Sequence, residues 1–450
     1  MAMEGKIFGT DGIRGRFDEG WLTPERVSAL GRAIARADVS GSGETKRALI
    51  AHDGRASGPV LERAIAAGLG AEGVSSVSAG LLTTPGLAWL TQTGDYDLGV
   101  MISASHNPAG DNGVKVFSAS GEKLDDEAEA RVEELLWADD SGTESSGEVS
   151  FDAALAEAYT AYLREQACPD LDLSGVRVAL DCANGAGSYV APAALEGLGA
   201  AVTSIHCAPN GENINRGCGS THPEDLQATV RVGDHDIGIA LDGDGDRCIL
   251  VDERGDLVHG DGIMTVLARW RMANIPYTDP RMVATVMSNR GLHRALREVG
   301  VEVVTVGVGD KQVVDALKSE GLDLGGEQSG HIIFGKDNAY IGDGTYTALR
   351  VLRVLCSEGA PLSQLASPYQ EFPQVLLNVP VASKPALESL SSINARALTH
   401  ETELGDDGRV LLRYSGTEPV LRVMVEGPDE QRIQEMARDI ADLVTAELGA

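Results

Sequence analysis

The run Gly99–Lys115, GVMISASHNPAGDNGVK, carries a serine where an apolar strand is expected to end. The apolar stretch Leu98–Ile102 gives way abruptly to SASHNP at positions 103–108. In an α/β sheet, ligands bind at the carboxyl ends of the strands. We therefore take Ser105 as a candidate nucleophile. The competing interpretation is an ordinary turn, in which Ser and Asn side chains bond to the local backbone.

Three carboxylates alternate with glycine in the second chemical motif, DGDGDR, at Asp242–Arg247. Strand-like segments flank it, and glycine lets such a loop curl so that alternate Asp side chains converge. Clustered oxygen ligands of this kind select Mg²⁺ or Ca²⁺. An EF-hand loop is excluded, because Arg247 occupies the position that needs Gly and an extended segment would carry Glu253 away. A solvated acidic hairpin turn remains the alternative.

Three further polar loops could bind anions or sugar hydroxyls. A Gly-rich loop with one Arg, or an Arg beside hydroxyls in a tight bend, suits phosphate, whereas a carboxylate and a hydroxyl two positions apart suit adjacent sugar hydroxyls. Plain turns or solvated loops are the alternative interpretation of each. The three loops are Gly9–Gly15 with Arg14, Gly325–His331 with Glu327, Ser329 and His331, and Arg413–Pro419 with Ser415, Gly416 and Thr417, to which Arg422 could add a second cation.

These parts together favour one reaction class. Ser105 lacks the Gly-x-Ser-x-Gly frame of an acyl hydrolase. The nine His are scattered, which argues against a zinc phosphatase, and no Gly-x-x-x-x-Gly-Lys-Ser/Thr loop for a nucleotide is present. A serine near a divalent cation, an Arg and a remote phosphate cradle predict phosphoryl transfer to and from the serine.

The elements that must position these residues repeat along the chain. Three segments, starting at Arg47, Val176 and Arg281, each read as an apolar strand, a Gly/Asn/Asp turn, a helix, a Gly stop and a second strand. This is a βαβ unit three times, with parallel pairing and helices on the sheet faces. The stretch WADDSGTESSG at 137–147 is predicted to be a linker. From Phe372 onward, three strands and two helices predict a small antiparallel α+β domain.

Length and charge bound the protein class. At 450 residues the chain exceeds one core, and neither a signal peptide nor a membrane-spanning run is recognisable. The six cysteines form no Cys-x-x-Cys pair, so we expect a cytoplasmic protein. With 68 acidic against 37 basic residues, of which only 8 are Lys, the net charge of −31 repels nucleic acid and anionic membranes. An acidic, Lys-poor surface also predicts a halophilic protein that works in concentrated salt.

Taken in order along the whole chain, the motifs FGTDGIRG, ISASHNP, DGDGDR, GEQSGH and RYSGTEP closely resemble those of the α-D-phosphohexomutases. Within the family, GEQSGH, SGTEP, Glu212–Leu226 and Val306–Lys311 are most similar to the branch that acts on glucosamine phosphates. Lys311 departs from that branch, which more often carries Arg there. Arg and Lys both keep the charge, but Lys loses a bidentate phosphate contact.

The resemblance implies a fold of three similar α/β/α domains with mixed, mostly parallel sheets, plus a smaller C-terminal α+β domain, around a central cleft. The expected boundaries are 1–150, 151–256, 257–371 and 372–450. It also implies that Ser105 is modified to phosphoserine and contributes an oxygen to one Mg²⁺ per subunit, held with Asp242, Asp244 and Asp246. The other implied roles are Arg14, His106, Lys115 and Arg247 around the transferring phosphoryl group, Glu327, Ser329 and His331 at the sugar, and Lys311, Arg413, Ser415, Gly416, Thr417 and Arg422 at the phosphate that does not react.

The implied partner is a small-molecule sugar phosphate, with no nucleic acid and no membrane, and the expected assembly is a monomer or homodimer. A hexose or hexosamine 1,6-bisphosphate would serve as activator and intermediate. Mannose or glucose phosphates are the alternative substrates within the family. A non-catalytic sugar-phosphate-binding protein is the alternative from another class.

Overall fold

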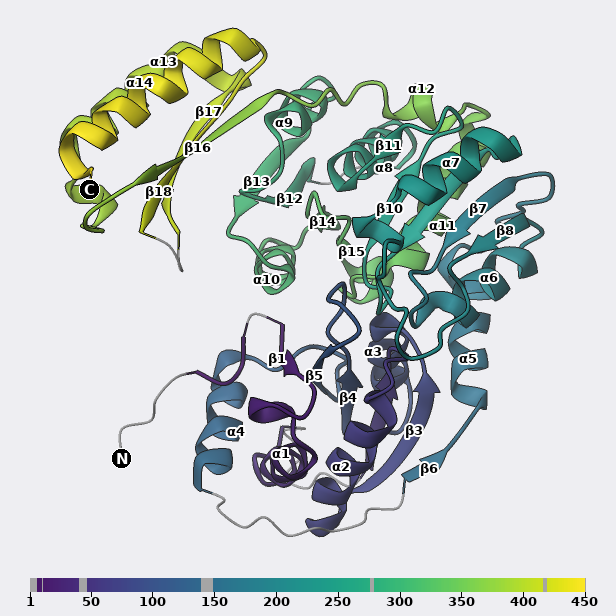
Figure 1. The fold of residues 1–450 in the computed structure, drawn as a ribbon. Helices are drawn as coiled ribbons and strands as arrows, with labels where there is room; N and C mark the ends of the chain where they lie inside the picture. Colours follow the sequence, from purple (N-terminus) through teal and green to yellow (C-terminus); the bar gives the residue numbers. More distant parts are fainter. Residues whose placement is uncertain are drawn as a thin grey trace. The chain divides into compact units, whose positions relative to one another are not determined.

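The structure is a computed structural model, and it describes residues 6–9, 11–39, 47–138, 149–275, 279–415 and 419–449 (Figure 1). The chain divides into two compact units. Unit 1 comprises Met1–Met287 and Val304–Ala366, and unit 2 comprises Ser288–Val303 and Ser367–Ala450. Four sheets are present among the described residues, three of them associated with the βαβ segments and the fourth with the C-terminal segment.

The first sheet contains six strands in the order β1-β5-β4-β2-β3-β6. Strands β2, β3, β4 and β6 are parallel, as the first βαβ segment predicts, and β5 pairs antiparallel with both β4 and β1. All five residues of β4 are buried. Its elements are β1 (Ile13–Arg16), η1 (Gly20–Leu22), α1 (Pro24–Arg36), β2 (Arg47–His52), α2 (Gly58–Ala71), β3 (Ser75–Leu81), α3 (Thr84–Thr93), β4 (Leu98–Ile102), β5 (Asp111–Ser118), α4 (Asp126–Ala138) and β6 (Val149–Phe151).

The second sheet, in the order β11-β10-β9-β7-β8, presents the DGDGDR loop. Strands β7, β8 and β9 are parallel, and β10 returns antiparallel to β9, so the predicted turn between strands is confirmed. Its elements are α5 (Ala154–Tyr162), η2 (Leu163–Ala167), β7 (Arg177–Asp181), α6 (Gly187–Gly197), β8 (Ala201–Ile205), η3 (Gly219–Thr221), α7 (Glu224–Gly233), β9 (Ile237–Leu241), β10 (Cys248–Val251) and β11 (Leu257–Val258).

The third sheet is smaller and has the order β13-β12-β14-β15. β14 is parallel to β12, and β15 turns back antiparallel, which places the GEQSGH segment between β14 and β15. Its elements are α8 (Gly260–Asn274), β12 (Arg281–Thr285), α9 (Arg290–Arg297), β13 (Glu302–Val306), α10 (Asp310–Glu320), β14 (Leu324–Gly326), β15 (Ile332–Phe334), η4 (Lys336–Asn338), α11 (Gly344–Glu358) and α12 (Leu362–Ala366).

The C-terminal segment forms an antiparallel sheet in the order β16-β18-β17. Alternate residues of β18, namely Leu421, Val423 and Val425, are fully buried against α14, as the period of two along a strand requires. The predicted α+β domain is therefore confirmed. Its elements are β16 (Gln374–Pro380), η5 (Leu387–Ser389), α13 (Ser391–Leu404), η6 (Gly405–Asp407), β17 (Arg409–Tyr414), β18 (Val420–Glu426) and α14 (Glu430–Leu448).

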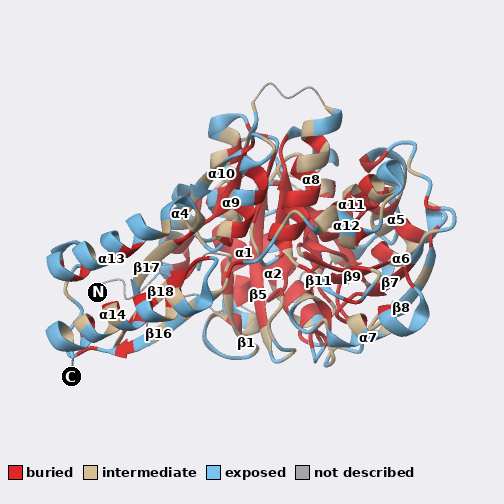
Figure 2. Cartoon of the chain, turned by 90° about the horizontal axis from the view of Figure 1, so that it is seen from above, coloured by how far each residue is buried: buried red, intermediate tan, exposed pale blue. Residues whose placement is uncertain are grey.

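Burial follows these layers. Figure 2 shows the buried residues concentrated in the strands and on the helix faces that cover them, with exposed residues on the outer helix faces. No helix among the described residues combines the length and the apolar character that crossing a membrane requires. Most of the predicted linker at 137–147 lies outside the described residues, but Trp137 and Ala138 close helix α4.

Candidate functional site

Ser105 follows strand β4 in a strained backbone conformation. Its φ of 51° lies in the left-handed region, which costs a non-glycine residue about 1–3 kcal/mol unless its surroundings hold it there. The Ser105 N–H donates to Ser103 Oγ at 2.8 Å, and the Ser103 hydroxyl donates to the Asp53 carboxylate at 2.7 Å. A buried Asp53–Arg55 ion pair of 2.8 Å completes this support. The loop is thus built to aim one side chain.

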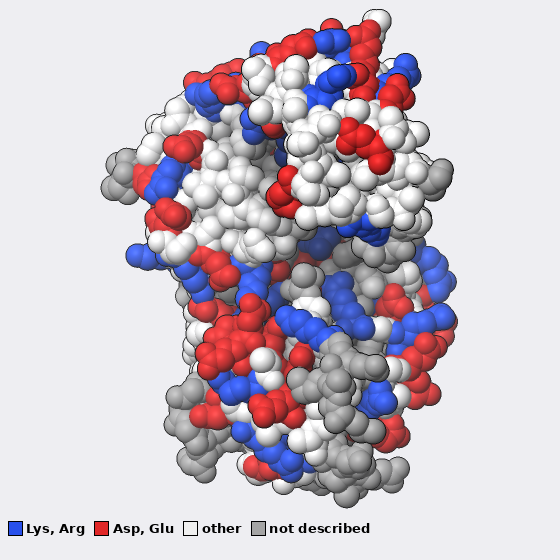
Figure 3. Space-filling model, turned by 90° about the vertical axis from the view of Figure 1, so that its left-hand side faces the viewer, with Lys and Arg blue, Asp and Glu red and all other residues white. Residues whose placement is uncertain are grey.

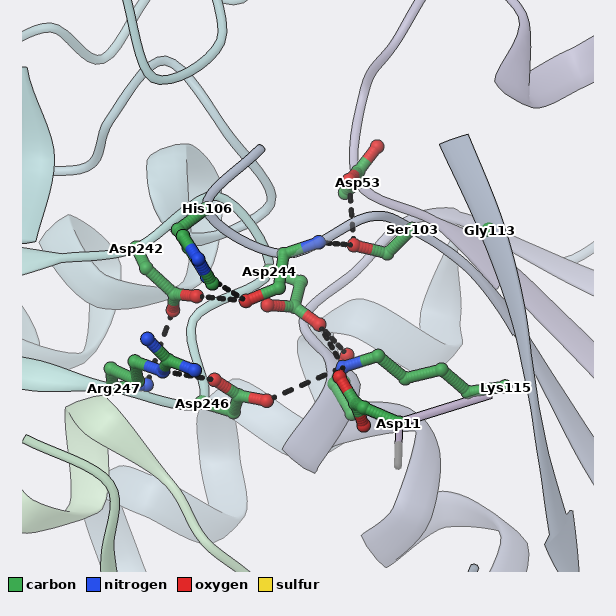
Figure 4. A network of polar contacts seen from close by, with 12 residues as sticks. Asp11, Asp53, Ser103, His106, Gly113, Lys115, Asp242, Asp244, Asp246 and Arg247 are labelled. Atoms are coloured by element: carbon green, nitrogen blue, oxygen red, sulfur yellow. Dashed lines mark hydrogen bonds and ion pairs between the residues drawn. The ribbon is translucent and has the colours of Figure 1, made fainter. Parts of the chain in front are cut away.

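That side chain points at the carboxylate loop between β9 and β10. The Ser105 hydroxyl donates to Asp242 Oδ2 at 2.6 Å, although the two residues are 137 positions apart. Asp242, Asp244 and Asp246 each offer an oxygen, and these oxygens lie within 4.8 Å of one another (Figure 4). Gly243 allows this approach, because a Cβ there would lie 2.5 Å from the Ser105 carbonyl oxygen. The two strongest sequence motifs therefore form one site.

Lys115, on β5, balances part of this negative charge. Its buried ammonium lies 2.8 Å from Asp244, 3.4 Å from Asp246 and 3.0 Å from Asp11. Burial alone would lower the pKa of Lys115, but the three carboxylates outweigh it and hold that pKa well above its ordinary value. The three carboxylates therefore favour the charged form of Lys115.

The carboxylates differ in their electrostatic surroundings. Burial raises the pKa of Asp242 well above its ordinary value, and the charges of Asp246 and Asp244 add to the rise. Burial also opposes ionisation of Asp244, but the Lys115 ammonium overcomes it and lowers the pKa of Asp244. The buried Oδ1 atoms of Asp244 and Asp246 receive no hydrogen bond from the described residues. Oxygen ligands with unused acceptor capacity fit a hard divalent cation such as Mg²⁺.

A cavity of about 380 Å³ opens beside this cluster, and half of its lining residues are Asp, Glu, Lys or Arg. Three of its lining residues escaped the sequence reasoning: Asp11, Lys123 and Asp310. Lys123 bridges the carboxylates of Asp11 and Asp310. These carboxylates outweigh burial and raise the pKa of Lys123, the contribution of Asp310 being the larger. Asp11 belongs to the motif FGTDGIRG and Asp310 to the segment Val306–Lys311 (VGVGDK), so their place in these segments was the available signal.

Several predicted residues meet at the cavity. Arg14, His106, Arg247, Glu327 and His331 all line it. His106 Nδ1 lies 3.4 Å from Ser105 Oγ, and Arg247 donates its backbone N–H to Asp242 at 3.2 Å. Arg14 is paired with Asp11. The Glu327 carboxylate accepts a hydrogen bond from the Gly309 N–H at 3.1 Å, which places it at the N-terminus of α10.

Other predicted residues lie elsewhere. Ser329 is exposed in the β14–β15 loop, and Lys311 forms an ion pair of 2.7 Å with Asp126, so neither lines this cavity. Arg413 and Arg422 face each other as register partners on β17 and β18 in unit 2, close in sequence to the buried Ser415. Gly416 and Thr417 lie outside the described residues.

Burial of His106 lowers its pKa below the ordinary histidine value, and the neighbouring Arg247 and Arg14 lower it further. His106 is therefore neutral at neutral pH in this arrangement, and its ring can accept a proton. A hydroxyl at a carboxylate cluster, a buried cation and a cavity to which Arg14, Lys123 and Arg247 contribute positive charge form an arrangement that can hold a phosphoryl group next to Ser105.

Comparison with known proteins shows which family the chain belongs to. Four family models match in order: the α/β/α domains I, II and III of phosphoglucomutase/phosphomannomutase at residues 5–143, 157–255 and 259–372, and the C-terminal domain at 376–443. A phosphoglucosamine mutase of Mycobacterium marinum is 47% identical over 445 residues, covering 98% of this chain and 99% of the relative. A phosphoglucosamine mutase of Syntrophotalea carbinolica is 45% identical over 452 residues, covering 99% of each.

Solved structures share the architecture. The crystal structure of a phosphoglucomutase/phosphomannomutase family protein from Burkholderia thailandensis matches with a TM-score of 0.81 and 26% identity, covering 98% of this chain and 97% of that chain. An N-acetylphosphoglucosamine mutase of Aspergillus fumigatus, 19% identical, matches with a TM-score of 0.67 over 98% of this chain and 96% of that chain, a likeness of fold. The family models and the relatives together confirm the resemblance that the motifs indicated: the chain belongs to the phosphoglucomutase/phosphomannomutase family.

Proposed function

We propose that this chain is a phosphoglucosamine mutase, an isomerase that interconverts glucosamine 6-phosphate and glucosamine 1-phosphate. The observation that carries the proposal is the 2.6 Å hydrogen bond from Ser105 to the Asp242 carboxylate of the buried cluster. A serine hydroxyl held against a cation-binding site is placed for phosphoryl transfer. The full-length relatives that carry this name, at 44–47% identity, support the choice of sugar.

In the proposed cycle, phosphoserine 105 gives its phosphoryl group to the free hydroxyl of the sugar phosphate. The Ser105 O–P bond breaks, a sugar O–P bond forms, and the hydroxyl proton passes to Ser105 Oγ. The product is glucosamine 1,6-bisphosphate. This bisphosphate reverses its orientation in the cavity and returns its other phosphoryl group to Ser105. The two halves of the cycle are therefore the same reaction in opposite directions.

Each residue of the cluster has a role in that transfer. Asp242, Asp244 and Asp246 would hold Mg²⁺ with a phosphoserine oxygen, and the cation would neutralise charge on the transferring group. Lys115, Arg14 and Arg247 supply the remaining positive charge around the phosphoryl oxygens. His106, whose ring Nδ1 lies 3.4 Å from Ser105 Oγ, is the group that we assign to carry the proton.

The sugar and the second phosphate require residues beyond the cluster. We assign Glu327, Ser329 and His331 to the sugar. We assign binding of the non-reacting phosphate to Lys311 and to the C-terminal residues Arg413, Ser415, Gly416, Thr417 and Arg422. We also propose domain boundaries at 150, 256 and 371.

A panel of hexose 6-phosphates, assayed for formation of the 1-phosphate, tests the substrate. We expect glucosamine 6-phosphate to have the highest kcat/KM after the enzyme is primed with glucose 1,6-bisphosphate. A preference for mannose or glucose 6-phosphate would instead assign the chain to the phosphomannomutase/phosphoglucomutase branch. Absence of any turnover, with no phosphate on Ser105, would leave a sugar-phosphate-binding protein.

The requirement for Mg²⁺ is tested by Asp244→Asn. This change removes one anionic ligand, so we expect the Mg²⁺ concentration for half-maximal activity to rise roughly tenfold or more. The matched control is Asp256→Asn, an exposed carboxylate in the turn after β10. An unchanged Mg²⁺ response in Asp244→Asn would remove this residue from the metal site.

We further infer that the chain is adapted to concentrated salt. In the face shown in Figure 3, acidic side chains occur in several separate groups interspersed with Lys and Arg, as expected for a general excess of charge. In about 1 M KCl, where the Debye length is about 3 Å, self-repulsion of the −31 net charge is screened. We expect the midpoint of thermal unfolding to rise by roughly 5 °C or more over dilute buffer. The gain should shrink as the pH approaches the isoelectric point, and equal stability in both solutions would contradict the inference.

A further inference from the structure

Two carbonyl groups of the Ser105 loop, which connects β4 to β5, accept hydrogen bonds from two different side chains. Arg55, buried at the end of β2, donates from Nη2 to the carbonyl oxygens of Ser105 at 3.0 Å and Asn107 at 2.9 Å. Asn215 donates its side-chain amide to the same two oxygens, at 2.8 and 2.9 Å. Facing two carbonyl oxygens, the amide must present its nitrogen, since only that end can donate.

The two donors come from different sheets. Arg55 follows β2 of the first sheet, the sheet that also carries the Ser105 loop. Asn215 belongs to the loop between β8 and η3, beside the second sheet, which carries the carboxylate cluster. Arg55 can therefore shape the Ser105 loop from within, whereas Asn215 ties that loop to the neighbouring α/β unit.

Asn215 is itself rigidly placed. Its backbone N–H donates to the Ala183 carbonyl at 2.9 Å, its φ is 58°, and the residue is 8% exposed. The chain beyond Ala183 in turn donates the Ala186 N–H to the Gly243 carbonyl at 2.8 Å. A Cβ on Gly243 would lie 2.5 Å from the Ser105 oxygen and 2.7 Å from Asn215 Nδ2. The carboxylate loop, the Asn215 amide and the Ser105 carbonyl thus meet at one point.

We propose that Asn215 is a positioning residue for phosphoryl transfer, which docks the Ser105 loop onto the carboxylate loop so that Ser105 Oγ faces Asp242. The assignment rests on the proposed function of Ser105. It also gives a role to part of Glu212–Leu226. This segment is one of the points of similarity to the family, and none of its residues is assigned to the sugar or phosphate sites. Asn215 does not line the cavity, so it acts on the serine and leaves the contacts of the sugar phosphate unchanged.

The test measures capture of a phosphoryl group by Ser105 from glucose 1,6-bisphosphate, followed in rapid-quench samples by intact mass. Two variants, Asn215→Asp and Asn215→Gly, remove the side-chain N–H groups that Asn215 donates to the two carbonyl oxygens. Both replacement residues still tolerate the left-handed backbone. Asn213→Ala is the matched control, because its amide bonds within the same loop, to the Ala208 carbonyl, and does not reach Ser105.

We expect the maximal rate of capture to fall roughly 10- to 100-fold in both Asn215 variants, since the buried Ser105 carbonyl and the part-buried Asn107 carbonyl each lose a donor. The bisphosphate concentration that gives half the maximal rate should stay within about twofold of wild type, as for a residue without substrate contact. Asn213→Ala should keep the wild-type rate. The same split between kcat and KM is expected in the full mutase assay.

Three results would overturn the proposal. They are a wild-type rate in a folded Asn215 variant, an equal loss in Asn213→Ala, and a loss confined to substrate affinity. If one Asn215 variant fails to fold, as thermal unfolding would show, the other carries the test. If wild-type protein itself takes no phosphoryl group on Ser105, the proposed function fails and this inference fails with it. A wild-type rate in the variants, with capture intact, refutes the positioning role alone.

Discussion

Ser105→Ala should lose mutase turnover by at least about a thousandfold, because it removes the hydroxyl that carries the phosphoryl group between the two half-reactions of the proposed cycle. The variant should also show no added phosphoryl mass after incubation with glucose 1,6-bisphosphate. The fold should survive, since the neighbouring Asp53–Arg55 pair and Asn215 still hold the loop. Turnover by coupled assay and intact mass measure the two effects.

Two companions separate the hydroxyl from the backbone strain at this position. Ser105→Gly also removes the hydroxyl, so it should be as inactive as Ser105→Ala. Glycine adopts a φ of 51° without the strain of a side chain, so Ser105→Gly should be at least as stable as Ser105→Ala. Ser120→Ala, in the exposed turn after β5, should behave as wild type in every assay. Residual activity above about one hundredth of wild type in both Ser105 variants would disprove the nucleophile assignment.

The second large effect is expected for Lys115→Met. The substitution leaves Asp11, Asp244 and Asp246 without the buried cation that they share. Removing one partner from a buried ionic cluster typically costs about 3–5 kcal/mol. We expect a comparable loss in the free energy of unfolding, with part of it recovered on adding Mg²⁺. Activity at saturating Mg²⁺ should still fall roughly 100-fold or more, since a cation near the transferring group is gone.

A surface lysine supplies the control for this prediction. Lys318 pairs with Glu122, and both side chains are partly exposed, so Lys318→Met should change the free energy of unfolding by less than about 1 kcal/mol. Thermal and denaturant unfolding with and without Mg²⁺ give the comparison. Lys115→Met with wild-type stability, or with a loss that Mg²⁺ deepens, would contradict the electrostatic account of the cluster.

Much of the fold could be predicted because local chemistry and topology agree. The βαβ segments are recognisable in the sequence as an apolar run, a polar turn and a helix. Parallel pairing of their strands follows from that order. Glycine alternating with Asp predicts a loop, and the structure confirms it between β9 and β10. The family resemblance then supplied the arrangement that periodicity alone could not.

The sequence could not show which polar groups far apart in the chain share a hydrogen bond. Asp53 and Arg55 lie in a motif that reads as an ordinary turn, yet they hold the Ser105 loop through buried contacts. Lys123 looks like a surface lysine before its bridge to Asp11 and Asp310 is seen. Such contacts depend on how separate sheets are juxtaposed, and no local pattern encodes that. The functional roles of the candidate residues remain predictions for the experiments above.

The groups that we propose to react come from two hairpins, β4–β5 with Ser105 and Lys115, and β9–β10 with the three carboxylates. Each hairpin forms from neighbours in the chain, but neither has a complete set of reactants. The proposed phosphoryl transfer therefore depends on the contact between the two hairpins, which the Ser105–Asp242 hydrogen bond makes. A chain in which only one of the two hairpins had formed would lack either the serine or the carboxylates that the proposed transfer needs.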